Sequence, residues 1–270
     1  MRSKLTPDQV HQYERAGFVH PVDVLDPSEA DAFRSRYEAV AALLGGSPKA
    51  VQMIQVHRFY HWAWELCTHS AVLDAVESLL GRDILLWSAS VFAKIPRDPG
   101  YVTMHQDGTY WGLAGGEVTT AWIALTASTR ENGCMRLLPG SHRSAILRHA
   151  DTFDADNLLT RGQQVQAEYD ESEVVDLQLL PGQMSLHHVR AIHGSHANTS
   201  DRSRIGLAIR YMTPDTKPER PDQGAALVRG NDRFGNWHLH GGPADFGSLE
   251  RAVREHQAEA ARFVATLTRD

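Results

Sequence analysis

The feature that most constrains the fold is a series of short apolar or alternating segments between residues 84 and 212, separated by Gly, Pro, Asn and Asp. The segments read ILLWSASVFAKI, VTTAWIALTAS, MRLLPGS, VVDLQLLPGQMSLHHV and RIGLAIRYM. Several short strands with turn signals between them are typical of an antiparallel sandwich or barrel. The sequence therefore predicts a mainly β fold over this region.

Helices are predicted on both sides of these strands. Thr6 followed by Pro7 gives a cap and a proline at the first helical position. A second helix is expected to begin after Asp26–Pro27, a third to end at Gly81, and a last one to cover about 248–266. The sequence thus favours a β-rich core with flanking helices.

We expect a single domain over 1–270, because no linker or internal repeat divides the chain. It would comprise N-terminal helices in 1–80, a barrel core over about 84–212, and a C-terminal lid and helix in 213–270. The lid is assigned to 213–237 because this segment is rich in Pro, Gly and charged residues.

Charge and cysteine content exclude several classes of protein. The net charge is −6 and there is no dense basic run, so nucleic acid and anionic membranes are not expected partners. Two cysteines form neither a disulfide framework nor a Cys-based zinc site. No signal peptide or membrane span is evident, which favours a cytoplasmic protein. Either a monomer or a homodimer is compatible with the sequence.

The segment YVTMHQDGTYWGL holds His105 and Asp107 two positions apart. Within a strand, residues i and i+2 point to the same face, so an imidazole and a carboxylate would lie side by side. One histidine and one carboxylate are two of the three ligands of the facial triad that holds Fe(II) with open positions. The pair therefore predicts a metal site that needs one more histidine.

Four histidines on the later segment LHHVRAIHGSH offer the third ligand: His187, His188, His193 and His196. His193 is preferred because GSHANTSDRS makes a natural turn between it and Arg204. His188 remains the rival, since strand parity can slip by one residue.

The strand predicted over RIGLAIRYM separates two kinds of side chain. Ile205, Leu207 and Ile209 form an apolar face suited to an external layer. The opposite face carries small residues with an arginine at each end, Arg204 and Arg210. Arg204, on a strand adjacent to His193, would present a guanidinium fork to a carboxylate. A metal with such an arginine implies an acid ligand that chelates at one end.

Three segments together resemble the phytanoyl-CoA dioxygenase family of Fe(II)/2-oxoglutarate-dependent oxygenases: HQDGTYWGL, AWIALTASTRENGCMRLLPGSH and LLPGQMSLHHVRAIHGSHANTSDRSRIGLAIRY. The resemblance covers most of the chain, to about residue 212. It implies a double-stranded β-helix, a jelly-roll and cupin-like barrel, with the triad near its mouth. It also implies Fe(II), 2-oxoglutarate and O2 as metal, cosubstrate and oxidant.

The resemblance assigns further roles by position. His193 matches the second histidine, and Arg204, eleven residues later, matches the arginine that binds 2-oxoglutarate. Ser195, Trp122 and Lys94 match positions at the cosubstrate pocket. Relatives that halogenate carbon replace the carboxylate by a small residue, so Asp107 favours hydroxylation.

Substrate contacts are expected at the barrel mouth, where polar and aromatic groups favour a small polar metabolite. The candidates are Thr109, Tyr110, Trp111, Asn132, Arg190 and Arg210. Alternative outcomes with the same cofactors are desaturation, cyclisation or oxidative demethylation. A barrel that binds a metal or small ligand without turnover is the non-enzymatic alternative.

Overall fold

The computed structural model describes residues 4–109, 111–220 and 223–267. Five α-helices and five short 3-10 helices are present in this part of the chain. The α-helices are α1 (Pro7–Ala16), α2 (Pro27–Leu43), α3 (His61–Cys67), α4 (Ser70–Leu80) and α5 (Leu249–Leu267). The 3-10 helices are η1 (Ala50–Gln52), η2 (Val56–Arg58), η3 (Asp107–Thr109), η4 (Ser141–Arg143) and η5 (Glu171–Glu173). None of the described helices is long and apolar enough to span a membrane.

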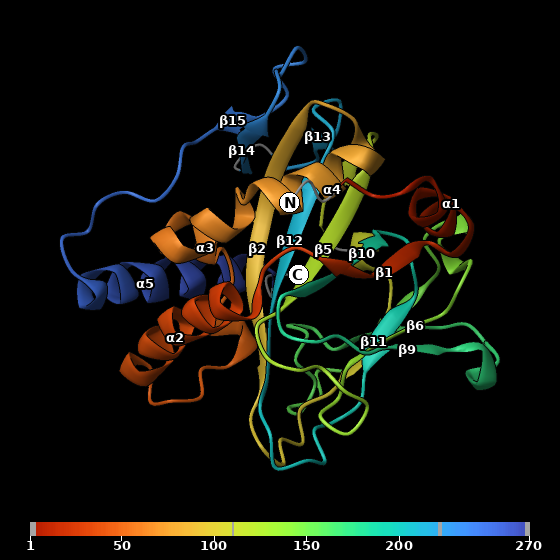
Figure 1. The fold of residues 1–270 in the computed structure, drawn as a ribbon, viewed down its shortest axis with the longest axis horizontal. Coiled ribbons are helices and arrows are strands. Elements are labelled where there is room, and N and C mark those ends of the chain that lie inside the picture. The colour runs from red at the N-terminus through yellow and green to blue at the C-terminus, as the bar shows by residue number, and fades with distance from the viewer. Residues whose placement is uncertain (1–3, 110, 221–222, 268–270) are drawn as a thin grey trace.

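Two sheets form the centre of the molecule (Figure 1). The larger has seven strands, in spatial order β1 (Phe18–Asp23), β10 (Gln183–His188), β5 (Val118–Ala124), β12 (Arg204–Met212), β2 (Ile84–Lys94), β14 (Gly224–Arg229) and β15 (His238–Leu239). The smaller has four, in the order β3 (Val102–His105), β11 (His193–Ser195), β6 (Met135–Leu137) and β9 (Val175–Leu177). Two strand pairs lie apart: β4 (Leu113–Ala114) with β13 (Lys217–Pro218), and β7 (His149–Asp151) with β8 (Gln163–Val165).

The helix ends follow the capping residues. Thr6 accepts a hydrogen bond from the Gln9 amide and completes a capping box, and Asp26 caps α2 in the same way. Gly81, with φ 82°, ends α4. These local signals confirm the predicted helix positions.

The alternation along β12 places the two sides of the large sheet in different surroundings. Ile205, Leu207 and Ile209 belong to the main hydrophobic core, together with Phe33 of α2 and Val72 of α4. The opposite face packs on the small sheet, and one hydrophobic cluster contains residues of both sheets: Ala208, Trp122, Met135, Leu137 and Leu177. In Figure 1, α2, α3, α4 and α5 lie around the large sheet, away from β6, β9 and β11.

This arrangement confirms the expected mainly β fold with flanking helices, a double-stranded β-helix of the jelly-roll type, in which two facing antiparallel sheets enclose the interior. The sequence did not predict β1, which pairs with β10. The segment assigned to a lid also differs, because residues 224–229 form β14 and hydrogen-bond to β2. That part of the segment is fixed in the large sheet.

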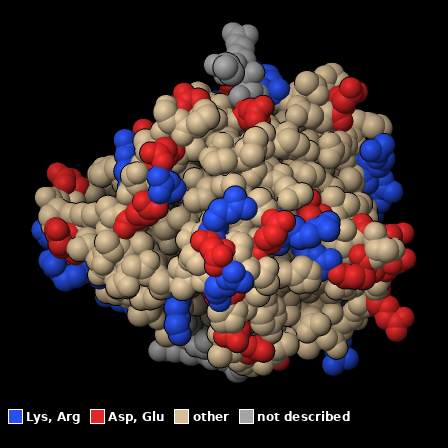
Figure 2. Space-filling model, turned by 60° about the horizontal axis from the view of Figure 1, so that its bottom comes forward, with Lys and Arg blue, Asp and Glu red and all other residues tan. Residues whose placement is uncertain are grey.

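Figure 2 shows one face of the molecule, on which basic and acidic side chains are interspersed. No continuous basic surface is visible there. A mixed surface of this kind offers no groove of positive charge along which a phosphate backbone would lie.

Candidate active site

The HxD pair lies at the end of a strand. His105 is the last residue of β3, whereas Asp107 begins the 3-10 helix η3. The expectation that both side chains share a strand face is therefore wrong in its geometry, because a turn brings them together. His105 Nε2 lies 3.4 Å from Asp107 Oδ1. Buried Gln106 holds this turn, since its side-chain amide donates to the Arg190 carbonyl at 2.8 Å.

His193 of β11 lies directly opposite His105 of β3 in the small sheet. The two ring centroids are 4.3 Å apart, and His193 Nε2 is 3.9 Å from Asp107 Oδ1. The three residues are buried and offer ligand atoms that all lie within 4.8 Å of one another. Two imidazoles and one carboxylate thus converge on one point.

Backbone carbonyls fix the orientation of both imidazole rings. His105 Nδ1 lies 2.9 Å from the Thr103 carbonyl, and His193 Nδ1 lies 3.0 Å from the Ala191 carbonyl. A carbonyl can only accept, so each Nδ1 carries the proton and each Nε2 presents a lone pair to the site. These are the tautomers that a metal needs.

The protonation states also suit a divalent metal. Burial alone would raise the pKa of Asp107, but His193, His105 and His187 hold it well below its usual range. Burial lowers the pKa of His193 well below its usual value. Two imidazoles with a carboxylate form a donor set for non-haem Fe(II), so the residues present fit that ion.

His188, the rival for the third ligand, points elsewhere. Its Nδ1 accepts from the Arg190 amide at 3.0 Å, and its Nε2 lies 3.6 Å from a carboxylate oxygen of Glu117. The neighbouring His187 does face the site, with Nε2 3.7 Å from Asp107 Oδ2. That His187 faces the site was not predicted from the sequence, which favoured His193 and then His188.

Arg204 lines the same cavity from the large sheet. The expectation that it lies on the strand adjacent to His193 is wrong, because β11 and β12 belong to different sheets and face each other. Its guanidinium carbon is 5.3 Å from the centre of the Trp122 ring, and its Nε has no hydrogen-bond partner. Burial lowers its pKa to about 10, so it remains a cation at neutral pH.

The surroundings of Arg204 are suited to an organic anion. Among the described residues, no carboxylate forms an ion pair with it, and a buried unpaired cation is costly. The bidentate guanidinium matches a carboxylate such as the distal one of 2-oxoglutarate. The cavity therefore fits that cosubstrate.

Ser195 and Lys94 lie beside Arg204. Lys94 Nζ donates to Ser195 Oγ at 2.8 Å and to the His196 carbonyl. Ser195 lines the cavity, whereas Lys94 is fully buried behind it. Burial and the adjacent Arg204 lower the pKa of Lys94 to about 6. Lys94 is thus placed to orient Ser195.

Two of the expected substrate contacts, Trp111 and Arg210, line the cavity. Three others do not. Thr109 Oγ1 donates a hydrogen bond to the Gln106 carbonyl. The Asn132 side chain accepts from the Thr129 amide and donates to the Ala127 carbonyl, which stabilises a turn. The Arg190 carbonyl accepts from the Gln106 side chain. Tyr110 lies outside the described residues. Of the five candidates that the structure describes, Trp111 and Arg210 remain.

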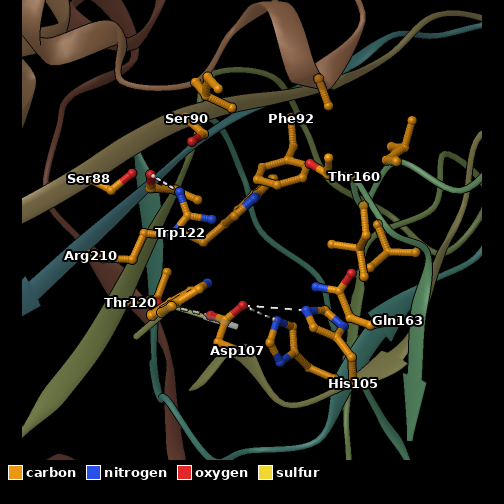
Figure 3. A pocket seen from close by; sticks show the side chains of 18 of the residues that line it. Ser88, Ser90, Phe92, His105, Asp107, Thr120, Trp122, Thr160, Gln163 and Arg210 are labelled. Carbon is orange, nitrogen blue, oxygen red and sulfur yellow. Dashed lines mark hydrogen bonds and ion pairs between the residues drawn. The ribbon is translucent and has the colours of Figure 1, made fainter. Parts of the chain in front are cut away.

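Much of the cavity wall was not predicted from the sequence. The additional lining includes Ser88, Ser90 and Phe92 of β2 and Thr120 of β5 (Figure 3). Val51 and Ile54 near η1 also line the cavity. Alternation in SASVFAK would have indicated Ser88, Ser90 and Phe92, because they share a face with Lys94. Residues 158–161, from the polar segment between β7 and β8, and Gln163 of β8 also line the cavity.

Comparison with known proteins gives the family. The profile described as Phytanoyl-CoA dioxygenase (PhyH) matches residues 13–206. The chain belongs to this family. The predicted resemblance is therefore confirmed.

Individual proteins similar to this chain agree with the assignment. A Caenorhabditis elegans protein named probable phytanoyl-CoA dioxygenase is 25% identical over 241 residues, or 79% of this chain and 77% of that protein. The apo structure of ThoJ, a non-heme monooxygenase, is 31% identical with a TM-score of 0.78 over 95% of this chain and 100% of that one. The alpha-ketoglutarate-dependent carbocyclase SnoK is 28% identical with a TM-score of 0.65, covering 79% of this chain and 86% of that one.

A PhyH member with this donor set is an oxygenase that depends on iron and 2-oxoglutarate. The metal donors expected for this family lie at the cavity between the two sheets. The comparisons name several different reactions and leave the substrate of this chain to be inferred.

Proposed function

We propose that this PhyH-family protein hydroxylates an unactivated C–H bond of a small polar metabolite, with release of succinate and CO2. One observation carries the proposal: three buried metal donors converge beside a cavity whose far wall holds the unpaired Arg204. His105, Asp107 and His193 are the residues that would hold Fe(II). The bound iron supplies the activation of O2 that decarboxylates 2-oxoglutarate and oxidises the substrate.

Arg204 is proposed to bind the distal carboxylate of 2-oxoglutarate, assisted by the Ser195 hydroxyl. Trp122 lies under the guanidinium and shields it from solvent, since the indole is buried. A carboxylate held in this dry pocket gains more from the guanidinium than it would in water. The cosubstrate would thus be oriented with its oxo-acid end toward the histidines.

The residues around Asp107 limit how its carboxylate can act. Thr120 Oγ1 donates to Asp107 Oδ2 at 3.3 Å, and Oδ1 is the oxygen that faces both histidines. The hydrogen bond favours use of Oδ1 alone as a ligand and leaves the remaining positions for cosubstrate and O2. Because the carboxylate is present, hydroxylation is favoured over halogenation.

A second candidate outcome keeps the same cofactors but ends in ring closure, desaturation or oxidative demethylation. The similarity to the carbocyclase SnoK supports it. Hydroxylation adds one oxygen atom to the substrate, whereas desaturation and ring closure remove two hydrogens. The mass of the product therefore separates hydroxylation from desaturation and ring closure.

The test is succinate release by the purified protein with Fe(II), 2-oxoglutarate and air, across amines, amino acids, organic acids, sugars and acyl-CoA esters. His105→Ala is the inactive blank, and His188→Ala is the matched control because His188 lies outside the ligand set. Substrate-stimulated succinate in the wild type and in His188→Ala, lost in His105→Ala, would support the proposal. Binding of iron and 2-oxoglutarate without turnover of any compound would favour the non-catalytic alternative.

A further inference from the structure

Arg210 is a second buried arginine in the cavity, and the assignment of iron and 2-oxoglutarate leaves it without a role. It lies six residues after Arg204 on β12, on the same cavity-facing side, with Ala208 between them. At the rise of an extended strand the two Cα atoms are roughly 20 Å apart. The carboxylate of 2-oxoglutarate that is proposed to bind Arg204 therefore does not also bind Arg210.

The surroundings of Arg210 orient its guanidinium without neutralising it. The guanidinium carbon lies 5.8 Å from the centre of the Phe92 ring and 5.5 Å from that of Trp111. Nη1 makes one long hydrogen bond, 3.3 Å, to the Ala208 carbonyl, and Nε has no partner. Aromatic rings beside the planar group leave its edge open to a carboxylate fork.

The charge of Asp107 acts on Arg210, but among the described cavity-lining residues no carboxylate forms an ion pair with it. Asp107 is the only carboxylate among these residues, and it does not lie within ion-pair distance of Arg210. A divalent metal with Asp107 and Arg204 balances dianionic 2-oxoglutarate. Arg161 also lines the cavity but is paired with Asp151 at 2.7 Å. Arg210 then remains as a positive charge, together with Arg220 of the cavity lining, so the cavity favours a further anionic group.

We propose that Arg210 binds a carboxylate group of the substrate, so that this enzyme oxidises small organic acids with an apolar body. The inference rests on the proposed function and specifies its substrate class. Ser88 faces Arg210 across β2 and β12, lines the cavity, and offers a second donor for the same carboxylate (Figure 3). Val51, Ile54, Leu158 and Leu159 supply the apolar wall against which the rest of the acid lies.

The test is isothermal titration of the full chain loaded with Mn(II) and the inert cosubstrate analogue N-oxalylglycine, which occupies the Arg204 end. The probes are 3-phenylpropanoate, octanoate and indole-3-acetate, each compared with its primary amide. In the wild type at least one acid should bind roughly tenfold or more tightly than its amide. In Arg210→Gln this preference should disappear, and in Arg210→Lys it should persist in part because the charge remains without the fork.

Arg161→Gln is the matched control, since it alters a cavity-lining arginine that is already paired. It should keep the preference for acids. Each variant is compared by thermal melting, and Ser88→Ala provides a milder change at the same subsite. The inference is overturned if no acid is preferred over its amide, or if the preference survives in Arg210→Gln or is lost in Arg161→Gln instead.

The loading step separates this inference from the proposed function. If N-oxalylglycine binds in a metal-dependent manner but acids show no preference, only the carboxylate subsite is refuted. If N-oxalylglycine does not bind, the proposed function fails, and the inference falls with it.

Discussion

The indole of Trp122 lies directly against the backbone of Gly206, where an added Cβ atom would come within 2.0 Å of Cζ2. Gly206 lies on β12 between Arg204 and Ala208, both of which line the cavity. Glycine at this position allows the ring to sit under the guanidinium. Any side chain there would displace Trp122 toward the proposed 2-oxoglutarate pocket.

Gly206→Ala should therefore weaken 2-oxoglutarate binding and lower the free energy of unfolding by about 1–3 kcal/mol, a typical cost of overpacking. Calorimetric titration and denaturant unfolding measure the two effects. Gly241→Ala is the control, because no atom lies within 4 Å of the added Cβ and the residue is exposed. If both variants bind 2-oxoglutarate equally well and have the same free energy of unfolding, Trp122 moves aside without loss of stability.

Removal of a proposed ligand should abolish stabilisation by metal. A metal that binds only the folded chain adds about 2.7 kcal/mol at a free concentration one hundred times its Kd. We expect anaerobic Fe(II) to raise the melting temperature of the wild type and of His188→Ala, and chelator to reverse the rise. His193→Ala should show no rise. A metal-induced shift that persists in His193→Ala would argue for a different ligand set.

Lys94 should make stability depend on pH in the alkaline range. Its pKa is about 6 in the folded chain and 10.5 when unperturbed, so between these values the unfolded chain binds the additional proton. Stability should rise with pH in this window, by roughly 1 kcal/mol per pH unit for this group alone. Urea unfolding of the wild type and Lys94→Met at pH 7, 8 and 9 tests this, because the variant should lack that part of the slope. Parallel curves would mean that Lys94 stays protonated when folded.

His256 of α5 links the C-terminal helix to the cavity wall. Its Nε2 donates to the Ile54 carbonyl at 2.6 Å, and its Nδ1 accepts from the Tyr60 hydroxyl at 2.8 Å. His256→Leu would leave both partners unsatisfied, at a cost of about 1–3 kcal/mol. Amide hydrogen exchange should become faster over residues 50–56. Glu255→Gln, on the exposed side of the same helix, should leave exchange unchanged.

Local signals in the sequence were sufficient for much of the fold. The caps at Thr6 and Asp26 and the terminating Gly81 depend on a few adjacent residues, so they could be predicted. The alternation in β12 identified its core face because burial on one side imposes a period of two. β1 was not predicted, since it begins directly after the glycine that ends α1.

Long-range pairing explains where the sequence analysis of the site fell short. Sequence spacing placed Arg204 next to His193, but their strands belong to opposite sheets. The carboxylate of Asp107 reaches His105 through a turn held by Gln106, which no periodicity indicates. His187 faces Asp107 and His188 faces away because of strand pairing between β1, β10 and β5. Such relationships depend on contacts between distant segments.

The two sheets contribute different residues to the site. His105 and His193 lie on the small sheet and Arg204 and Arg210 on the large one, whereas Ala50, Val51, Ile54 and residues 158–161 line the cavity from outside these sheets. None of these residues outside the two sheets is a proposed metal ligand. Exchange of these segments between relatives should therefore change the apolar wall that meets the body of the substrate, while the metal ligands and the carboxylate subsite at Arg210 stay in place.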